Sequence, residues 1–281
     1  MTTGSPVEEL FGASKALIGM VHVSALPGTP FASWPIARIV DHAVAEAKLL
    51  AGAGFHALIV ENMHDRPYLP GRVGPEIVSA MTLVAGAVRQ AVSIPIGVQI
   101  LAGANREALA VALAAGASFI RAENFVFAQV ADEGLMPQAD AGPLLRYRRQ
   151  LGAEHVRIFA DIKKKHAAHA LTADVDLAGA ARAAAFFGAD GVIVTGPATG
   201  EPARPEDVCV ARAAVELPVA VGSGLALDNL RDYWEPADLF IVGSALKRDG
   251  LWHNPLDPDR VAGFAAFFRS LAAEVAPRPD C

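Results

Sequence analysis

The sequence predicts an α/β protein, a single (β/α)₈ TIM barrel. Short, nearly continuous apolar runs alternate with longer alanine-rich stretches along all 281 residues, as in parallel strands that helices cover on their outer face. The last two apolar runs each end in glycine and serine, where TIM barrels commonly bind a phosphate. An open doubly wound sheet would instead carry its glycine-rich turn after the first strand. We therefore expect one barrel.

The predicted strands are the short apolar runs. They are Ala16–Val23, His56–Asn62, Ile94–Leu101, Phe119–Asn124, Val156–Lys163, Gly191–Gly196, Pro218–Gly224 and Leu239–Ser244. Between them, apolar residues three and four positions apart predict helices. These helices are Pro35–Ala51, Pro75–Val92, Arg106–Ala115, Asp174–Phe187 and Pro258–Val275. Asp257, directly before Pro258, is typical of a helix N-cap.

Nothing in the composition divides the chain into domains. We expect residues 1–281 to form one barrel, with an N-terminal extension at 1–14 and a C-terminal tail at 276–281. The loop Phe125–Pro143 after the fourth strand is longer than usual. It is either a lid over the barrel mouth or a packed surface excursion.

Charge and cysteine content limit the function classes. The formal net charge of −6 argues against a general nucleic-acid surface. Cys209 and Cys281 fit no zinc motif and are expected to be free thiols. Glu8 and Glu9 stand where a signal peptide carries positive charge,, and no apolar run approaches the roughly 18 residues that span a bilayer. We expect a cytoplasmic homo-oligomer with no integral membrane segment.

Polar residues at the predicted strand ends are the candidates for chemistry, because TIM-barrel active sites form at the C-terminal ends of the strands. Glu61 or Asp161 is predicted to act as general base. Lys165 is predicted to polarise or covalently trap a carbonyl, and His22 to take a hydrogen-bonding or acid–base role. The predicted substrate-binding residues are Asn62, Asp65, Arg66, Gln99, Arg121, Glu123, Lys163, His166, Thr195, Gly222, Ser223, Gly224, Gly243 and Ser244.

The glycine and serine residues in that set are expected to bind phosphate through backbone N–H groups. Side chains alternate along a strand, so Asp161, Lys163 and Lys165 should share one face, with Lys165 nearest the mouth. The alternative is that Arg121, Glu123 and Asp161 form an ion-pair network that merely fills the barrel.

No metal or other cofactor is expected, because the sequence has no HxH or HExxH spacing. A divalent metal held by His22, Glu61 and Asp161 is the open alternative.

The chain resembles the BtpA/SgcQ family of (β/α)₈ barrels over roughly Lys15 to Phe268. The motifs that carry the resemblance are Gly19–Gly28, Glu61-Asn62 with Asp65, Phe119–Arg121, Asp132–Gly134, Leu144–Arg148, Asp161 with Lys165-His166, Val194–Gly196 and the two Gly-Ser turns. Lys163, where the cyanobacterial pattern has valine, and Glu123-Asn124 make the chain more similar to the branch found in organisms without photosynthesis. The resemblance implies the barrel. The family is named for a factor needed for photosystem I accumulation, and some members lie among carbohydrate-utilisation genes.

Three hypotheses follow. The first is an enzyme acting on a small phosphorylated metabolite, a phosphosugar lyase, isomerase or transferase. The second is a non-catalytic assembly or regulatory protein that keeps the barrel as a scaffold. The third is a metal-assisted hydrolase.

Overall fold

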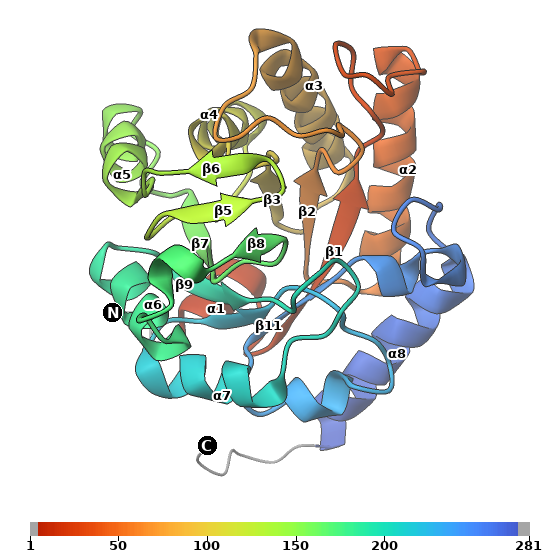
Figure 1. Cartoon of the computed structure of the whole chain (residues 1–281). Coiled ribbons are helices and arrows are strands. Elements are labelled where there is room, and N and C mark those ends of the chain that lie inside the picture. Colours follow the sequence, from red (N-terminus) through yellow and green to blue (C-terminus); the bar gives the residue numbers. More distant parts are fainter. Residues whose placement is uncertain (1–4, 275–281) are drawn as a thin grey trace.

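Eight parallel strands close into a barrel in the order β1-β11-β10-β9-β7-β4-β3-β2 in a computed structural model that describes residues 5–274 (Figure 1). They are β1 (Ala16–His22), β2 (Ala57–Glu61), β3 (Ile96–Gln99), β4 (Phe119–Ala122), β7 (Arg157–Ile162), β9 (Gly191–Val194), β10 (Val219–Val221) and β11 (Leu239–Val242). Each lies inside a predicted strand. The predicted TIM barrel is therefore confirmed.

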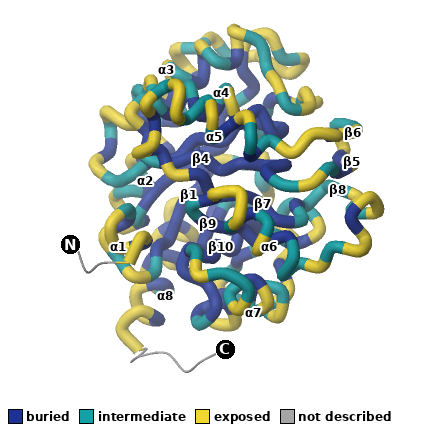
Figure 2. The backbone as a smooth tube through the Cα atoms, turned by 90° about the vertical axis from the view of Figure 1, so that its left-hand side faces the viewer, coloured by how far each residue is buried: buried dark blue, intermediate teal, exposed yellow. Residues whose placement is uncertain are grey.

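Helices surround the barrel, with their outer faces exposed and the strands buried (Figure 2). They are α2 (Ile36–Ala53), α3 (Pro75–Ala91), α4 (Asn105–Ala115), α5 (Ala141–Gln150), α6 (Leu177–Phe186), α7 (Pro205–Ala214) and α8 (Pro258–Glu274). The last residue of the predicted helix Pro258–Val275 lies outside the described residues. No helix within residues 5–274 is long and apolar enough to cross a membrane.

Two of these helices, α5 and α7, lie outside the five ranges that the apolar spacing predicts. In α5 the run Arg146-Tyr147-Arg148-Arg149 leaves only a narrow apolar stripe, although Leu144 is buried. The sequence features that indicate α7 as a helix are Pro205 at its start and acidic residues in its first turn,. After β10 the chain forms only a short 3₁₀ helix, Leu230–Tyr233.

The N-terminal extension contains a helix, α1 (Pro6–Phe11), that packs on the barrel. Ser5 caps it, and Val7 and Phe11 are buried. The ring of Phe11 lies 5.6 Å from that of Phe119 and belongs to the apolar cluster inside the barrel. Residues 6–11 are thus part of the barrel's packing. The predicted tail 276–281, including Cys281, lies outside the described residues, and Cys209 lies half-buried on α7.

The long loop after β4 is an ordered excursion with a hairpin, β5 (Gln129–Ala131) and β6 (Gly134–Met136). β5 also pairs with β8 (Ala167–Ala168), which follows β7, so the small sheet has the order β6-β5-β8. This pairing ties the loop after β4 to the loop after β7 and brings Asp132 and Glu133 to the barrel mouth.

Inside the barrel, apolar side chains give way to polar ones toward the mouth. On β1, Ile18 and Met20 belong to the interior apolar cluster and His22 follows them. On β7, Phe159 belongs to the same cluster and Asp161 follows it. Because residues two apart on a strand share a face, the polar site is a layer stacked on the apolar core.

Candidate active site

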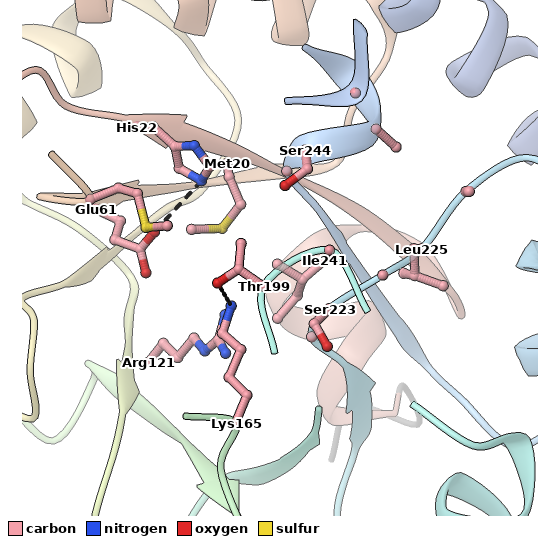
Figure 3. A pocket seen from close by; sticks show the side chains of 18 of the residues that line it. Met20, His22, Glu61, Arg121, Lys165, Thr199, Ser223, Leu225, Ile241 and Ser244 are labelled. Atoms are coloured by element: carbon pink, nitrogen blue, oxygen red, sulfur yellow. Dashed lines mark hydrogen bonds and ion pairs between the residues drawn. The ribbon is translucent and has the colours of Figure 1, made fainter. Parts of the chain in front are cut away.

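Two adjoining cavities open at the C-terminal mouth of the barrel. The first has a volume of about 260 Å³ (Figure 3). Its predicted site residues are His22, Glu61, Arg121, Lys165, Gly222, Ser223, Gly224, Gly243 and Ser244. The second has a volume of about 510 Å³ and contains Arg66, Gln99, Glu123 and His166 together with Glu61 and Lys165. Most of the predicted site is thus brought together.

Glycine is required in the turn after β10. Gly224 has a left-handed backbone (φ +64°), and a Cβ there would lie 2.2 Å from the backbone nitrogen of Pro202. The N–H of Gly222 donates to the carbonyl of Val194 (2.8 Å). Gly222 therefore lines the cavity, but its N–H is used by the sheet, contrary to the expectation that it binds phosphate.

The hydroxyl of Ser223 is also used internally. It accepts a hydrogen bond from the N–H of Gly196 (2.7 Å) and donates one to the carbonyl of Glu201 (3.0 Å). Ser223 therefore ties the loop after β9 to the end of β10. What this turn offers to a ligand is backbone rather than the serine side chain.

In the turn after β11, glycine makes room for the catalytic candidate His22. A Cβ on Gly243 would lie 3.3 Å from Nε2 of His22, tighter than an ordinary contact. The neighbouring Ser244 lines the cavity opposite Glu61 (Figure 3).

His22 and Glu61 form a pair suited to proton transfer. Nε2 of His22 lies 3.6 Å from Oε2 of Glu61, and Nδ1 lies 3.3 Å from the carbonyl oxygen of Trp252. A carbonyl only accepts, so Nδ1 carries the proton and a neutral ring presents the lone pair of Nε2 to Glu61.

The pKa values of this pair are shifted toward each other. Burial raises the pKa of Glu61. Burial, and then the charge of Lys247, lower the pKa of His22. Proton exchange between two groups is easiest when their pKa values are similar.

Arg121 and Asp161 form a buried ion pair. Nε of Arg121 lies 3.2 Å from both carboxylate oxygens of Asp161, and Nη2 lies 3.1 Å from Oδ2. Burial alone lowers the pKa of Arg121, but Asp161 and Glu61 raise it above the ordinary value. The guanidinium lines the first cavity, whereas Asp161 lines neither cavity. Asp161 therefore orients Arg121.

The three consecutive lysines diverge. β7 ends at Ile162, and Lys163 has a left-handed backbone (φ +46°), which breaks the strand alternation. Its Nζ donates to the carbonyl of Thr172 (3.1 Å), and it lines neither mouth cavity. The expected shared face of Asp161, Lys163 and Lys165 is therefore wrong for Lys163.

Lys164 and Lys165 both reach the mouth but in different charge environments. Nζ of Lys164 lies 3.3 Å from Oε2 of Glu123 and 3.8 Å from Oε2 of Glu133. Burial alone lowers the pKa of Lys164, but these two carboxylates raise it.

Lys165 lines both cavities, and its Nζ donates to Oγ1 of Thr199 (3.2 Å). Burial, and then Arg121, lower its pKa. Lys165 is therefore the lysine that is more readily neutral, which a nucleophilic amine must be.

Three predicted binding residues lie behind the cavities. Asn62 donates to Asp65 (2.9 Å), and both accept hydrogen bonds from backbone N–H groups of neighbouring loops. Oγ1 of Thr195 accepts from the N–H of Lys165 (3.0 Å). None of the three lines a mouth cavity. In this geometry they position the loops.

Two more predicted residues lie in the second cavity. Arg66 stacks over the ring of Trp252, with 4.8 Å between guanidinium carbon and ring centroid. Nδ1 of His166 lies 3.3 Å from Asp132, and its Nε2 lies 2.9 Å from Oγ1 of Thr199. His166 thus links the hairpin to the loop after β9.

Several residues at the mouth were not predicted from the sequence. Strand alternation did not predict that Lys164 reaches the mouth, because the sequence pattern does not reveal the left-handed backbone of the preceding Lys163. Behind His22 lies a third cavity of about 400 Å³ with a buried ion pair, Lys247 and Glu46 (2.7 Å). Lys247 could have been noticed as the lysine that follows the second Gly-Ser turn.

The three predicted metal ligands do not converge. Asp161 is held by Arg121, whereas His22 and Glu61 pair with each other. Within residues 5–274, no three His, Cys, Asp or Glu side chains gather as a metal ion would need.

Comparisons with solved structures agree on the fold. The chain superimposes on thiamine phosphate pyrophosphorylase from Pyrococcus furiosus with a TM-score of 0.57 and 14% identity, covering 92% of this chain and 97% of that one. It superimposes on phosphoribosyl anthranilate isomerase from Thermus thermophilus with a TM-score of 0.56 and 12% identity, covering 91% and 99%. At these identities the likeness concerns the barrel alone.

Comparisons of sequence identify the family. An uncharacterized mitochondrial protein from Caenorhabditis elegans is 46% identical over 94% of this chain and 97% of its own length. The photosystem I biogenesis protein BtpA from Synechocystis is 36% identical over 97% and 93%. Residues 13–269 match the model of the BtpA family. The chain therefore belongs to the BtpA family.

Proposed function

We propose that this protein is an enzyme that acts on a small phosphorylated carbonyl metabolite, as a lyase, isomerase or transferase of the phosphosugar type. One observation carries the proposal. The first cavity lies between the two Gly-Ser turns on one side and the buried ionisable groups Glu61 and Lys165 on the other, with His22 beside Gly243 (Figure 3). In this proposal the turns bind the anion and the ionisable groups transfer protons within one space of metabolite size.

The phosphate is bound by the turns and by Arg121. Backbone N–H groups after β10 and β11 form a concave surface for an anion. Arg121, whose charge is maintained by Asp161, lines the same cavity and supplies a planar donor set that matches phosphate oxygens.

Lys165 and Glu61 carry the chemistry. The neutral amine of Lys165 adds to the carbonyl carbon, and the carbonyl oxygen leaves as water with one amine proton and the proton of the Glu61 carboxyl, giving a protonated imine and the Glu61 carboxylate. The carboxylate of Glu61 then accepts a proton from the adjacent carbon, and the electron pair of that C–H bond moves to the imine nitrogen, giving a neutral enamine. His22 accepts that proton in turn at Nε2, which faces Glu61.

Thermal melting tests the phosphate site. At a hundred times its Kd, a phosphate ester should stabilise the protein by about 2.7 kcal/mol, a shift of a few degrees. Ser244→Asp places a negative charge in the cavity and should abolish the shift. Ser270→Asp, on the exposed face of α8, is the matched control and should keep it. A shift that survives Ser244→Asp would remove the proposed phosphate site.

A second candidate function, assembly of a protein complex, is favoured by one surface feature. Phe186 is 85% exposed and Phe187 50% exposed at the end of α6, with their rings 5.4 Å apart. Exposed aromatic side chains of this kind are enriched at protein interfaces. The double variant Phe186→Ser/Phe187→Ser should lower the molar mass in light scattering if this surface joins subunits. An unchanged mass would remove the surface from any self-association.

A further inference from the structure

The third cavity, of about 400 Å³, lies at the same end of the barrel as the first two. Its wall comes from α2 and from the loops after β1, β2 and β11, three strands that are adjacent in the barrel. It shares His22 with the first cavity and Arg66 with the second. A ligand in this cavity would therefore lie beside the proposed active site, on the face where TIM barrels bind their ligands.

Several polar side chains of this wall make no hydrogen bond or ion pair with any described residue. They are Ser24, Ser33, His42, His64, Arg66 and His253. Each is half-buried or exposed, so a ligand in the cavity can reach it. Hydroxyl, imidazole and guanidinium groups can all donate hydrogen bonds to an anion.

Arg66 is the group in this set whose charge is permanent. Its guanidinium carbon lies 4.8 Å from the ring centroid of Trp252 and 5.4 Å from that of Phe31. No carboxylate within residues 5–274 forms an ion pair with it. The two rings orient the guanidinium and leave its N–H groups for a ligand, since these donate in the plane of the group.

The carboxylate in the wall is already neutralised. Oε1 of Glu46 accepts a hydrogen bond from Nζ of Lys247 (2.7 Å), and Oε2 of Glu46 is buried. Lys247 is 2% exposed. This pair adds no net charge and presents no free acceptor to a ligand. Asn254 is engaged as well, because its amide donates to the carbonyl of Arg248 (2.9 Å).

The surroundings of His64 show that the charge in this region is positive. Burial lowers the pKa of His64, and the positive charges of Lys247 and Arg66 then lower it further, to about 4. Positive neighbours oppose a proton on His64 for the same reason that they favour an anion beside it.

We infer that the third cavity is a second anion-binding site, which takes a phosphate group. A phosphate has enough oxygens for Arg66 and for several of the neutral donors, whereas a carboxylate has only two. The inference goes beyond the proposed function, because it involves neither the Gly-Ser turns nor Lys165. The phosphate belongs either to the far end of a bisphosphate that also occupies the first cavity or to a separate ligand.

Nuclear magnetic resonance of the full chain with labelled histidine rings tests the inference, with inorganic phosphate as the probe. Phosphate should shift the ring signals of His42, His64 and His253 in a saturable manner. Sodium chloride at the same pH and ionic strength should not. His155 is the internal control, because it is exposed just before β7, at the opposite end of the barrel.

Arg66→Met should weaken the phosphate affinity at these rings about tenfold to a hundredfold, the value of a hydrogen bond to a charged group. Arg106→Met is the matched control. Arg106 is also exposed and also stacks on a ring, that of Tyr147 at 3.9 Å, but it lies outside the third cavity. Ser244→Asp, which changes the first cavity, should preserve the shifts.

The outcomes separate this inference from the proposed function. The absence of saturable shifts, or equal phosphate affinity in Arg66→Met and Arg106→Met, would overturn the inference even where the first cavity binds phosphate. Saturable shifts in a protein whose melting is insensitive to Ser244→Asp would keep the inference and remove the proposed phosphate site.

Fructose 1,6-bisphosphate distinguishes the two sources of the phosphate. If one ligand fills both cavities, a single equivalent should bind, and both Arg66→Met and Ser244→Asp should weaken it. If the ligands are separate, two equivalents of inorganic phosphate should bind, and the bisphosphate should bind no more tightly than inorganic phosphate.

Discussion

The two sides of the barrel mouth are formed by different chemical groups. After β10 and β11 the wall is backbone and small residues, and its shape depends on glycines such as Gly224 and Gly243. After β4 and β7 the wall consists of buried charged side chains in pairs, Arg121 with Asp161 and Lys164 with Glu123. The backbone side is made by local conformation. The charged side exists only when residues about 40 positions apart meet.

The largest loss of stability should come from a substitution on the charged side of the mouth. Arg121→Met leaves the carboxylate of Asp161 buried without its cation, and should lower the free energy of unfolding by about 3–5 kcal/mol, measured by urea denaturation. The double variant Arg121→Met/Asp161→Leu should recover most of this loss, because no charge is left unpaired. If the single and double variants are equally unstable, the ion pair is not the reason for the loss.

On the backbone side, Gly224→Ala should destabilise by more than its backbone angle alone requires. The control is Gly152→Ala, at the same φ of +64° but with open space where its Cβ would lie. Gly152→Ala should cost about 1 kcal/mol, as a left-handed alanine does. Gly224→Ala should cost roughly 2–3 kcal/mol, because the loop at Pro202 must also move. Equal costs in urea denaturation would mean that the close approach is unimportant.

Substitutions of the adjacent lysines Lys164 and Lys165 should differ in effect, because Lys164 contributes to stability and Lys165 to the proposed chemistry. Lys164→Met should cost about 2 kcal/mol, because Glu123 and Glu133 lose their cation. Lys165→Met should change stability by less than about 1 kcal/mol, because burial already disfavours its charge,.

The reactivity of the same two lysines can be compared by trapping the proposed imine. With borohydride and a phosphorylated aldehyde or ketone, mass spectrometry should find the reduced adduct on Lys165 in the native protein and in Lys164→Met, and none in Lys165→Met. An adduct that persists in Lys165→Met would assign the imine to another residue.

The smallest effect should be a pH dependence near the third cavity. Burial, and then Lys247, lower the pKa of His64 from 6.5 to about 4. A depressed pKa contributes stability that is present above pH 6.5 and is lost as the pH falls toward about 4,. The difference in free energy of unfolding between the native protein and His64→Asn should shrink over this window by less than about 1 kcal/mol in total, because His64 is only half-buried and solvent screens the charges around it,. A constant difference would mean that His64 titrates normally.

The sequence predicted the backbone side of the mouth better than the charged side. The eight strands and both Gly-Ser turns were predicted within a few residues, because apolar runs and glycine report local conformation. On the charged side, the sequence predicted which charged residues lie at the strand ends. An ion-pair network of Arg121, Glu123 and Asp161 was an open alternative, and the structure pairs Arg121 with Asp161. The pairing of Glu123 with Lys164 was not predicted, nor that Lys163 points away from the mouth.

The sequence by itself determined the barrel, its family and the turns at its mouth, because each depends on patterns that neighbouring residues carry. The tertiary structure decided which charged groups reach the cavities. A single left-handed residue, Lys163, redirects Lys164 toward Glu123 and Lys165 toward Thr199. That redirection depends on the loops packed against it after β4 and β9, whose arrangement no local pattern contains.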